Sequence, residues 1–341
     1  MQRRRYLRAR RRRAQRNLAL VLSLLVLTGS GCDSGGTPEA APQKTYRIGI
    51  DIPFHPLFNY VSVNKDEYFE GFDVEFRILD TSTLIPAFGT GDLDVIATFP
   101  TSLPRIEQAY GFVAQEFLPL ARIQHGMAVW VPVDSPAHNL ADLRGSKVAV
   151  APLGQQWGED EAMVMIEAGA RIKDYFQVQE SGAPVQQLLL GRVDAAFVTG
   201  EATAVVAEDG GFRPLVSSDE IFARELGDPF VLSGGMAASR EFIGDNPAFI
   251  ERLIESFNDA WTKFRADPDA VAEVAAKEGG LSSEQVLGFS TAVGLLDMPP
   301  HTRRISHRDV ATWAQLYRAL ARSGFLKAAP DDPSKYFLIT E

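Results

Sequence analysis

Short apolar segments alternate with longer amphipathic ones over most of this chain, and that alternation restricts its possible folds more than any other feature. Strands separated by helices are typical of α/β folds in which the sheets are mostly parallel. Hydrophobic residues make up 45% of the chain, which is sufficient for a globular core. The predicted strands are residues 46–50, 73–78, 94–98, 127–133, 147–151 and 194–198.

The last third of the sequence predicts long helices. Asn246 and Pro247 form an N-cap and a first-turn proline, and residues 249–264 then place apolar side chains at helical spacing. Residues 306–323 repeat the apolar stripe, and Gly324 is in the position of a helix stop. We therefore expect α-helices to pack on the core in this region.

The first 32 residues have the pattern of an export signal. Residues 1–16 contain nine arginines and no acid, residues 18–27 form an apolar run, and residues 28–31 are small. These three parts describe a secretory signal peptide, and the run is shorter than the roughly 20 residues that span a bilayer. We predict a signal peptide over residues 1–31.

Cys32 is the only cysteine, so it cannot form an intramolecular disulfide. Residues 27–32 resemble a bacterial lipobox, with Gly29 where leucine is usual. The resemblance implies lipidation of Cys32 and a membrane-anchored lipoprotein in the periplasm or on the extracytoplasmic face. A plain secreted chain is the alternative. Residues 32–44 are rich in Gly, Pro and Ala and predict a flexible tether.

The body of the chain is acidic. With the nine arginines of the signal set aside, 25 of the 34 lysines and arginines remain, against 44 aspartates and glutamates. This balance argues against nucleic acid as a partner. The sequence also lacks a G-x-S-x-G elbow, a P-loop and a metal-spaced histidine pair, so we expect neither an enzyme nor a bound metal or cofactor.

Motifs in a fixed order resemble a known family. The body resembles ABC-transporter solute-binding proteins of the nitrate, taurine and thiamine-precursor group over about residues 45–265. The motifs that carry the resemblance are PLFNYV (56–61), GFDVEF (71–76), TGDLDV (90–95), DLRGSKVAV (142–150) and LGRVDAA (190–196).

This resemblance implies a type II periplasmic-binding-protein fold, with two doubly wound α/β lobes that are joined by two crossover strands and close on a ligand. Lobe 1 would comprise residues 45–126 and 236–341, and lobe 2 residues 127–235. The crossovers would lie near residues 124–126 and 233–235, where glycines could absorb hinge rotation. The implied partners are a small-molecule ligand and an ABC permease with its ATPase, and we expect the binding protein to be a monomer.

Four loops follow the carboxyl ends of predicted strands, where ligands of open α/β sheets bind. In the family such loops supply the ligand contacts. The predicted ligand-binding residues are Asp51, Phe54 and His55 in the first loop, Thr98, Phe99 and Thr101 in the second, Gln155, Gln156 and Trp157 in the third, and Thr199 and Glu201 in the fourth.

The residue types in these loops favour a flat ligand that donates hydrogen bonds. Trp157 could stack on a ring, and Asp51 and Glu201 could accept from an amine. A nitrogen heterocycle such as a pyrimidine or a vitamin precursor would fit. The four loops contain no Arg or Lys, so a sulfonate, nitrate or other small anion is the alternative. If residues 298–304 reach the cleft, Arg303 or Arg304 would favour that anion.

Two further functions stay open on the same fold. One is a ligand sensor without a transport role. The other is an enzyme like the pyrimidine-precursor synthases, which use a cysteine-rich motif that this chain lacks.

Overall fold

The computed structural model of the protein describes residues 44–50, 55–122, 127–151, 158–199, 202–292, 295–296 and 298–340. Gln43–Glu341 forms one compact unit. Within the described ranges, no helix combines the length and the apolar character that crossing a bilayer requires. The signal peptide, Cys32 and most of the predicted tether lie outside the described residues.

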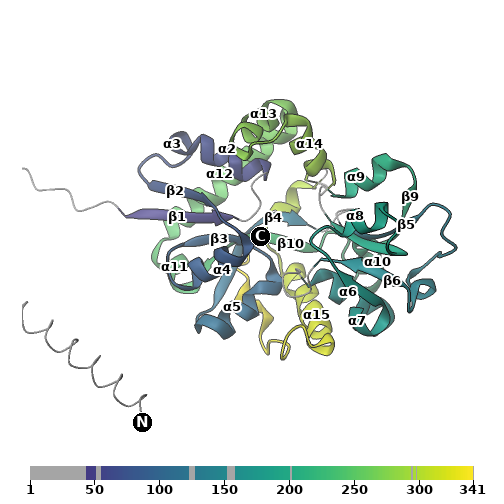
Figure 1. Ribbon diagram of the computed structural model, residues 1–341. Coiled ribbons are helices and arrows are strands. Elements are labelled where there is room, and N and C mark those ends of the chain that lie inside the picture. Colours follow the sequence, from purple (N-terminus) through teal and green to yellow (C-terminus); the bar gives the residue numbers. More distant parts are fainter. Residues whose placement is uncertain are drawn as a thin grey trace, which may run out of the picture. The chain divides into compact units, whose positions relative to one another are not determined.

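Two five-stranded mixed sheets form the framework (Figure 1). In each sheet three parallel strands are extended by antiparallel ones. The first, sheet A, has the order β2 (Asp73–Ile78), β1 (Thr45–Ile50), β3 (Val95–Thr98), β10 (Leu232–Ser239), β4 (Ala114–Arg122). The second, sheet B, has the order β7 (Gln177–Glu180), β6 (Lys147–Val150), β8 (Ala195–Thr199), β5 (Met127–Pro132), β9 (Phe212–Ser217).

Helices cover both faces of each sheet. The sequence explains several of their ends: Asp267 accepts the backbone N–H of Ala270 at the start of α13, and Gly324 ends α15 in the left-handed conformation. The helices are α2 (Pro56–Val63), α3 (Lys65–Tyr68), α4 (Thr81–Gly89), α5 (Leu103–Tyr110), α6 (Glu159–Ala168), α7 (Ile172–Tyr175), α8 (Pro184–Leu189), α9 (Ala202–Asp209), α10 (Ser218–Leu226), α11 (Arg240–Asp245), α12 (Pro247–Ala266), α13 (Pro268–Gly279), α14 (Ser283–Ala292) and α15 (His307–Ser323), with short 3-10 helices η1 (Pro100–Ser102), η2 (Leu140–Leu143), η3 (Pro300–Arg303) and η4 (Pro333–Tyr336).

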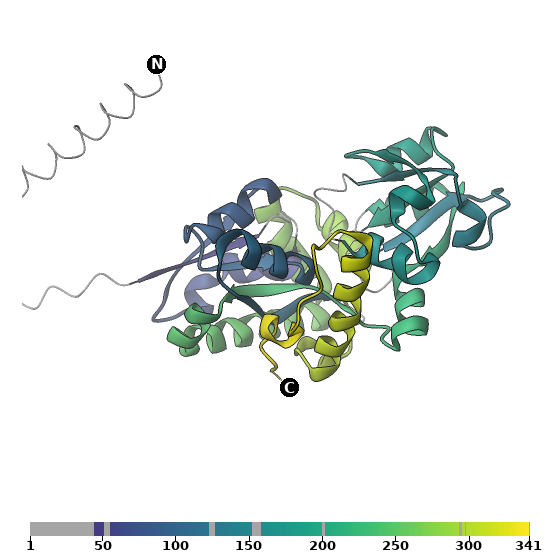
Figure 2. The ribbon, with the colours of Figure 1, turned by 90° about the horizontal axis from the view of Figure 1, so that it is seen from below.

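The apolar core is continuous between the sheets on one side. One cluster joins residues of α4 and α5 on sheet A to residues of α6, α7 and α10 on sheet B, with α15 between them. Figure 2 shows α15 between the strands of the two sheets. A second cluster packs α2, α12 and α13 on the other face of sheet A, and a third packs α8 and α9 on the other face of sheet B. The helix α15 therefore links the two halves of the fold.

All six predicted strands are present, within one residue at each end. Four strands were not predicted, and two of them, β4 and β10, form the long antiparallel pair at one edge of sheet A. Pro119 interrupts the apolar run of β4, and β10 contains Gly234 and Gly235, so neither has an ordinary strand composition.

The segment at residues 233–235, which we expected to be a crossover, lies inside β10. Gly234 and Gly235 permit close packing there. A Cβ on Gly235 would lie 2.1 Å from Oε1 of Glu116 and 2.5 Å from the Leu118 carbonyl oxygen. The other expected crossover, near residues 124–126, lies outside the described residues.

Candidate functional site

The candidate site is the edge of the two sheets at which the parallel strands end. Of the predicted ligand residues, His55, Thr98, Phe99, Thr101 and Thr199 are described. The remaining predicted residues, Asp51, Phe54, Gln155, Gln156, Trp157 and Glu201, lie outside the described residues, and their roles stay predictions.

Thr98 ends β3 and pairs with Gly235 of β10, and both Thr98 and Thr101 are buried. Thr101 belongs to η1, whose Pro100 carbonyl accepts the hydroxyl of Tyr317 at 2.8 Å. This loop reaches sheet B: a Cβ on Gly158, the N-cap of α6, would lie 3.1 Å from Cγ2 of Thr101. The loop after β3 and the start of α6 are therefore in contact.

His55 lies on the face of sheet A that α2 covers. It is buried, it forms the N-cap of α2, and its Nδ1 accepts the backbone N–H of Phe58 at 3.4 Å. Its ring meets the edge of Phe289 of α14. Burial, helped by the charge of Arg303, lowers the pKa of His55 to about 4, so the imidazole is neutral at pH 7.

Arg303, whose charge acts on His55, is buried, with 4% of its surface exposed. Its Nη1 donates to the Pro119 carbonyl at 2.9 Å, and its guanidinium carbon lies 5.4 Å from the ring centre of Trp261. Among the described residues, its Nε and Nη2 have no hydrogen-bond partner. Burial lowers the pKa of Arg303 to about 9, which still leaves it a cation at pH 7. It is thus a buried positive charge with unused donors.

Acidic residues occupy the other side of the same edge, next to α15. Glu116 of β4 and Glu159 and Asp160 of α6 are buried. Burial raises the pKa of Glu116 and Glu159 well above the ordinary value, and raises that of Asp160 to about 7. These three residues were not among the predicted ligand-binding residues. An acid within the apolar run of β4 is a usable signal for Glu116, whereas Glu159 and Asp160 look like ordinary first-turn acids.

Arg122, at the end of β4, joins the segments around the site. Its guanidinium pairs with Asp309 of α15 and donates to the carbonyls of Phe230 at 2.9 Å and Arg304 at 2.8 Å. Arg122 is the last residue of β4, after which the chain goes from sheet A to sheet B. Phe230 lies before β10, in the segment through which the chain returns to sheet A. This buried ion pair and its two hydrogen bonds therefore connect the end of β4 and the segment before β10 to α15.

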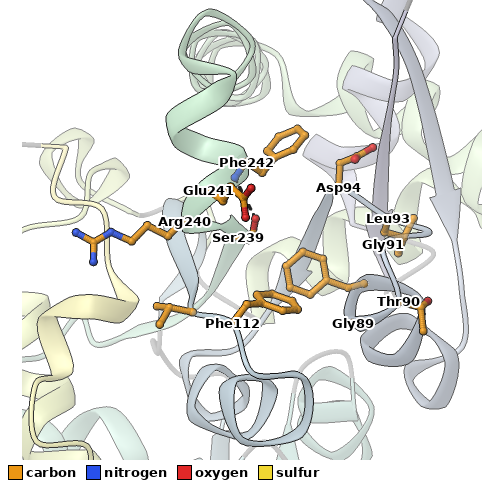
Figure 3. Close-up of a pocket in the computed structure, with 12 residues that line it drawn as sticks. Gly89, Thr90, Gly91, Leu93, Asp94, Phe112, Ser239, Arg240, Glu241 and Phe242 are labelled. Carbon is orange, nitrogen blue, oxygen red and sulfur yellow. Dashed lines mark hydrogen bonds between the residues drawn. The ribbon is translucent and has the colours of Figure 1, made fainter.

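A separate pocket of about 740 Å³ opens at the opposite edge of sheet A (Figure 3). Phe88, Phe112 and Phe242 form its apolar walls, and Asp94 and Glu241 contribute carboxylates. Asp94 precedes β3, so the pocket lies one strand length from Thr98. The Asp94 carboxylate already accepts the backbone N–H and the guanidinium of Arg47. We assign the candidate site to the other edge.

A family model described as "ABC transporter, phosphonate, periplasmic substrate-binding protein" matches residues 52–243, more than half of the chain. The protein belongs to this family. The match confirms the resemblance to ABC-transporter solute-binding proteins, and it makes the protein a periplasmic substrate-binding component of an ABC importer. No curated protein sequence matches the chain.

Solved structures agree on the fold. The aliphatic sulphonate binding protein SsuA from Escherichia coli has a TM-score of 0.69 at 18% identity, covering 88% of this chain and 94% of its own. The alkanesulfonate-binding protein SsuA from Xanthomonas axonopodis pv. citri, bound to MOPS, has a TM-score of 0.65 at 17% identity, covering 87% and 99%. These similarities confirm the predicted α/β periplasmic-binding-protein fold.

The same fold also occurs in an enzyme. The desulfurization enzyme DSZB has a TM-score of 0.56 at 18% identity, with coverage of 86% of this chain and 99% of its own. Fold similarity at this identity does not transfer an activity. The family match, by contrast, is to a class of transport proteins.

Proposed function

We propose that this protein captures a small organic oxyanion, of the phosphonate or sulfonate class, and delivers it to the ABC permease and ATPase. The observation that carries the proposal is the guanidinium of Arg303, which is buried and has two nitrogens without a partner among the described residues. A buried cation with free donors is unfavourable unless an acceptor completes it.

The chemistry of Arg303 fits this ligand class. A guanidinium presents parallel N–H donors, which bind the oxygens of phosphonate and sulfonate groups in pairs. The charge of Arg303 acts on His55, the last residue of the predicted loop at the carboxyl end of β1. Because His55 is neutral at pH 7, it adds no charge, and its Nδ1 already accepts the backbone N–H of Phe58. Thus Arg303 supplies the positive charge that the four predicted loops lack.

The comparisons support an anion over a heterocycle. The family is described by phosphonate, and two of the similar structures are sulfonate-binding proteins. The heterocycle hypothesis depends on Trp157 and Glu201, for which no contact is described. We therefore take the anion as the proposed ligand and keep pyrimidines and vitamin precursors as the comparison class in the test.

The two sheets would act as the centres of the two lobes, residues 45–126 with 236–341 and residues 127–235. In this proposal the ligand binds between them and stabilises the closed form, which the permease recognises. Lipidation of Cys32 would hold the protein at the membrane as a monomer. The protein would carry out no chemistry on its ligand.

A thermal-shift panel on the chain from Thr37 onward tests the ligand class, because this chain keeps the compact unit Gln43–Glu341. The panel sets alkylphosphonates, alkylsulfonates and MOPS beside pyrimidines, thiamine precursors and simple carboxylates, in a buffer without phosphate or sulfonate. A ligand at 100 times its Kd adds about 2.7 kcal/mol, and about 1 kcal/mol moves the Tm by roughly 2–4 °C. We expect a shift with phosphonates or sulfonates. A shift with heterocycles alone would contradict the proposal.

A further inference from the structure

Glu116 and Glu159 are two buried carboxyls, one from each half of the fold, and the charge of Glu159 acts on Glu116. Glu116 lies in β4 of sheet A, and Glu159 begins α6, which packs on sheet B. Their exposed fractions are 0% and 1%, and none of their four carboxyl oxygens has a hydrogen-bond partner within the described part of the chain. Ionised carboxylates in such surroundings are strongly unfavourable.

The groups around Glu116 come from four elements. Gly235 of β10 leaves space for its carboxyl, since a Cβ there would lie 2.1 Å from Oε1. The titratable and charged groups that act on Glu116 and Glu159 are Arg122 of β4, Asp309 and Tyr317 of α15, and Asp160 of α6; β10 contributes none.

Among the charged groups of the described residues, Arg122 alone favours an ionised Glu116, and its guanidinium is already paired with Asp309. Burial is the largest cause that raises the pKa of each glutamate, and Glu159 further raises the pKa of Glu116. The charge of Asp160 likewise raises the pKa of Glu159. In this arrangement both carboxyls retain their protons above the pH at which exposed glutamates ionise.

The arrangement depends on contact between the two halves. Gly158, the residue before Glu159, would meet Thr101 of the η1 loop and Phe325 if it carried a Cβ, at 3.1 and 3.0 Å. Separation of sheet B from sheet A would let water reach both carboxyls. Water would remove most of the penalty for ionisation, so the separated form would release protons.

We propose that closure of the two halves takes up protons at Glu116 and Glu159, so that closing is favoured in mildly acidic surroundings and weakens as pH rises. The proposal rests on the proposed function only in that ligand capture accompanies closure. Its sign follows from linkage: the closed form binds more protons, so its stability falls as pH rises through the raised pKa values.

The contribution of His55 to stability changes with pH in the opposite direction, so the pH range of the measurement must exclude its titration. Its pKa is lowered to about 4, so it reduces stability only as pH falls below its ordinary value of 6.5. Asp160 titrates near 7 and contributes little above that pH. Arg303, whose pKa is lowered to about 9, begins to lose its proton as the pH approaches that value, so the window from about pH 7.5 to about pH 8.5 is used to follow Glu116 and Glu159, whose pKa values are raised well above the ordinary one.

The test uses the unliganded chain from Thr37, which contains no cysteine of its own. Fluorophores on Val63→Cys and Leu190→Cys report the distance between the halves, because these side chains are 49% and 58% exposed on α2 and after α8. The Tm and the energy transfer are measured across the pH window. The variants are Glu116→Gln, Glu159→Gln and both together, and the control is Glu241→Gln, which makes the same change at an exposed position.

We expect the Tm of the wild type to fall by several degrees across the window, with a parallel loss of energy transfer. The double variant should show neither change, each single variant a partial one, and Glu241→Gln the full wild-type response. If the double variant does not fold, the proposal is tested by whether each single variant shows a smaller change in Tm and in energy transfer than the wild type. An energy transfer that does not change with pH, or that changes equally in the glutamine variants, would overturn the proposal. Because no ligand is present, this outcome is separate from the result of the ligand panel.

Discussion

Arg303→Met should make the unliganded protein more stable while it weakens ligand binding. The lowering of the Arg303 pKa from 12.5 to about 9 corresponds to a burial cost on the order of 5 kcal/mol for the charged form. Methionine removes that cost and fills similar apolar space. Against this gain stand the lost hydrogen bond to Pro119 and the lost contact with the Trp261 ring.

We therefore expect a net gain of about 1–2 kcal/mol, since replacing buried charges by apolar side chains is often neutral or stabilising. For a chain of this size such a gain raises the Tm by a few degrees. Hydrogen bonds to charged groups contribute about 1.5–3 kcal/mol, so the affinity for the anion should fall roughly ten- to a hundredfold.

The assay combines thermal unfolding without ligand and calorimetric titration with the anion identified by the panel. Arg304→Met is the matched control, because the Arg304 side chain is exposed and only its backbone carbonyl accepts a bond from Arg122. Arg304→Met should leave both the Tm without ligand and the affinity for the anion close to the wild-type values. An Arg303→Met protein that is less stable than wild type and binds with unchanged affinity would refute the assignment of Arg303 to ligand binding.

Three further outcomes follow from the packing. Gly235→Ala should cost about 1–3 kcal/mol in denaturant unfolding through overpacking, whereas Gly244→Ala, with nothing within 4 Å, should be neutral or slightly stabilising; equal effects would contradict the close approach. Between pH 6.5 and about 4 the unfolded state binds a proton that buried His55 does not, so His55 by itself lowers the stability by up to about 3 kcal/mol, opposite in direction to Glu116, Glu159 and Asp160; in thermal melts His55→Asn should therefore gain stability relative to wild type as pH falls through this range. Asp309→Asn leaves buried Arg122 without its counter-charge and should cost about 3–5 kcal/mol in unfolding experiments; a cost below 1 kcal/mol would show that the pair is dispensable.

Periodicity and end signals predicted much of the fold. The parallel strands β3, β6 and β8 have short, mainly apolar runs, β2 alternates, and the stripe of residues 249–264 with its Asn-Pro start matches α12. The strands β4 and β10 escaped prediction because their character depends on tertiary neighbours. Glu116 and the glycines of β10 fit a strand only because each accommodates the other across the ladder.

The site was harder to predict than the fold. Loops at the carboxyl ends of strands follow from the α/β pattern, and the structure places Thr98 and Thr101 at that edge. Nothing in the sequence indicates that the charge of Arg303, about 250 residues away along the chain, acts on His55. Nor does the sequence distinguish buried Glu159 from a solvated first-turn acid. Both facts depend on how α15 and the segment before it return to the two sheets.

A crystal structure of the protein with the phosphonate or sulfonate that gives the largest thermal shift tests the central claim most directly. The account predicts that oxygens of the anion lie about 2.7–3.2 Å from Nε and Nη2 of Arg303, between sheet A and sheet B. An anion bound elsewhere, with Nε and Nη2 of Arg303 still unpaired, would contradict it.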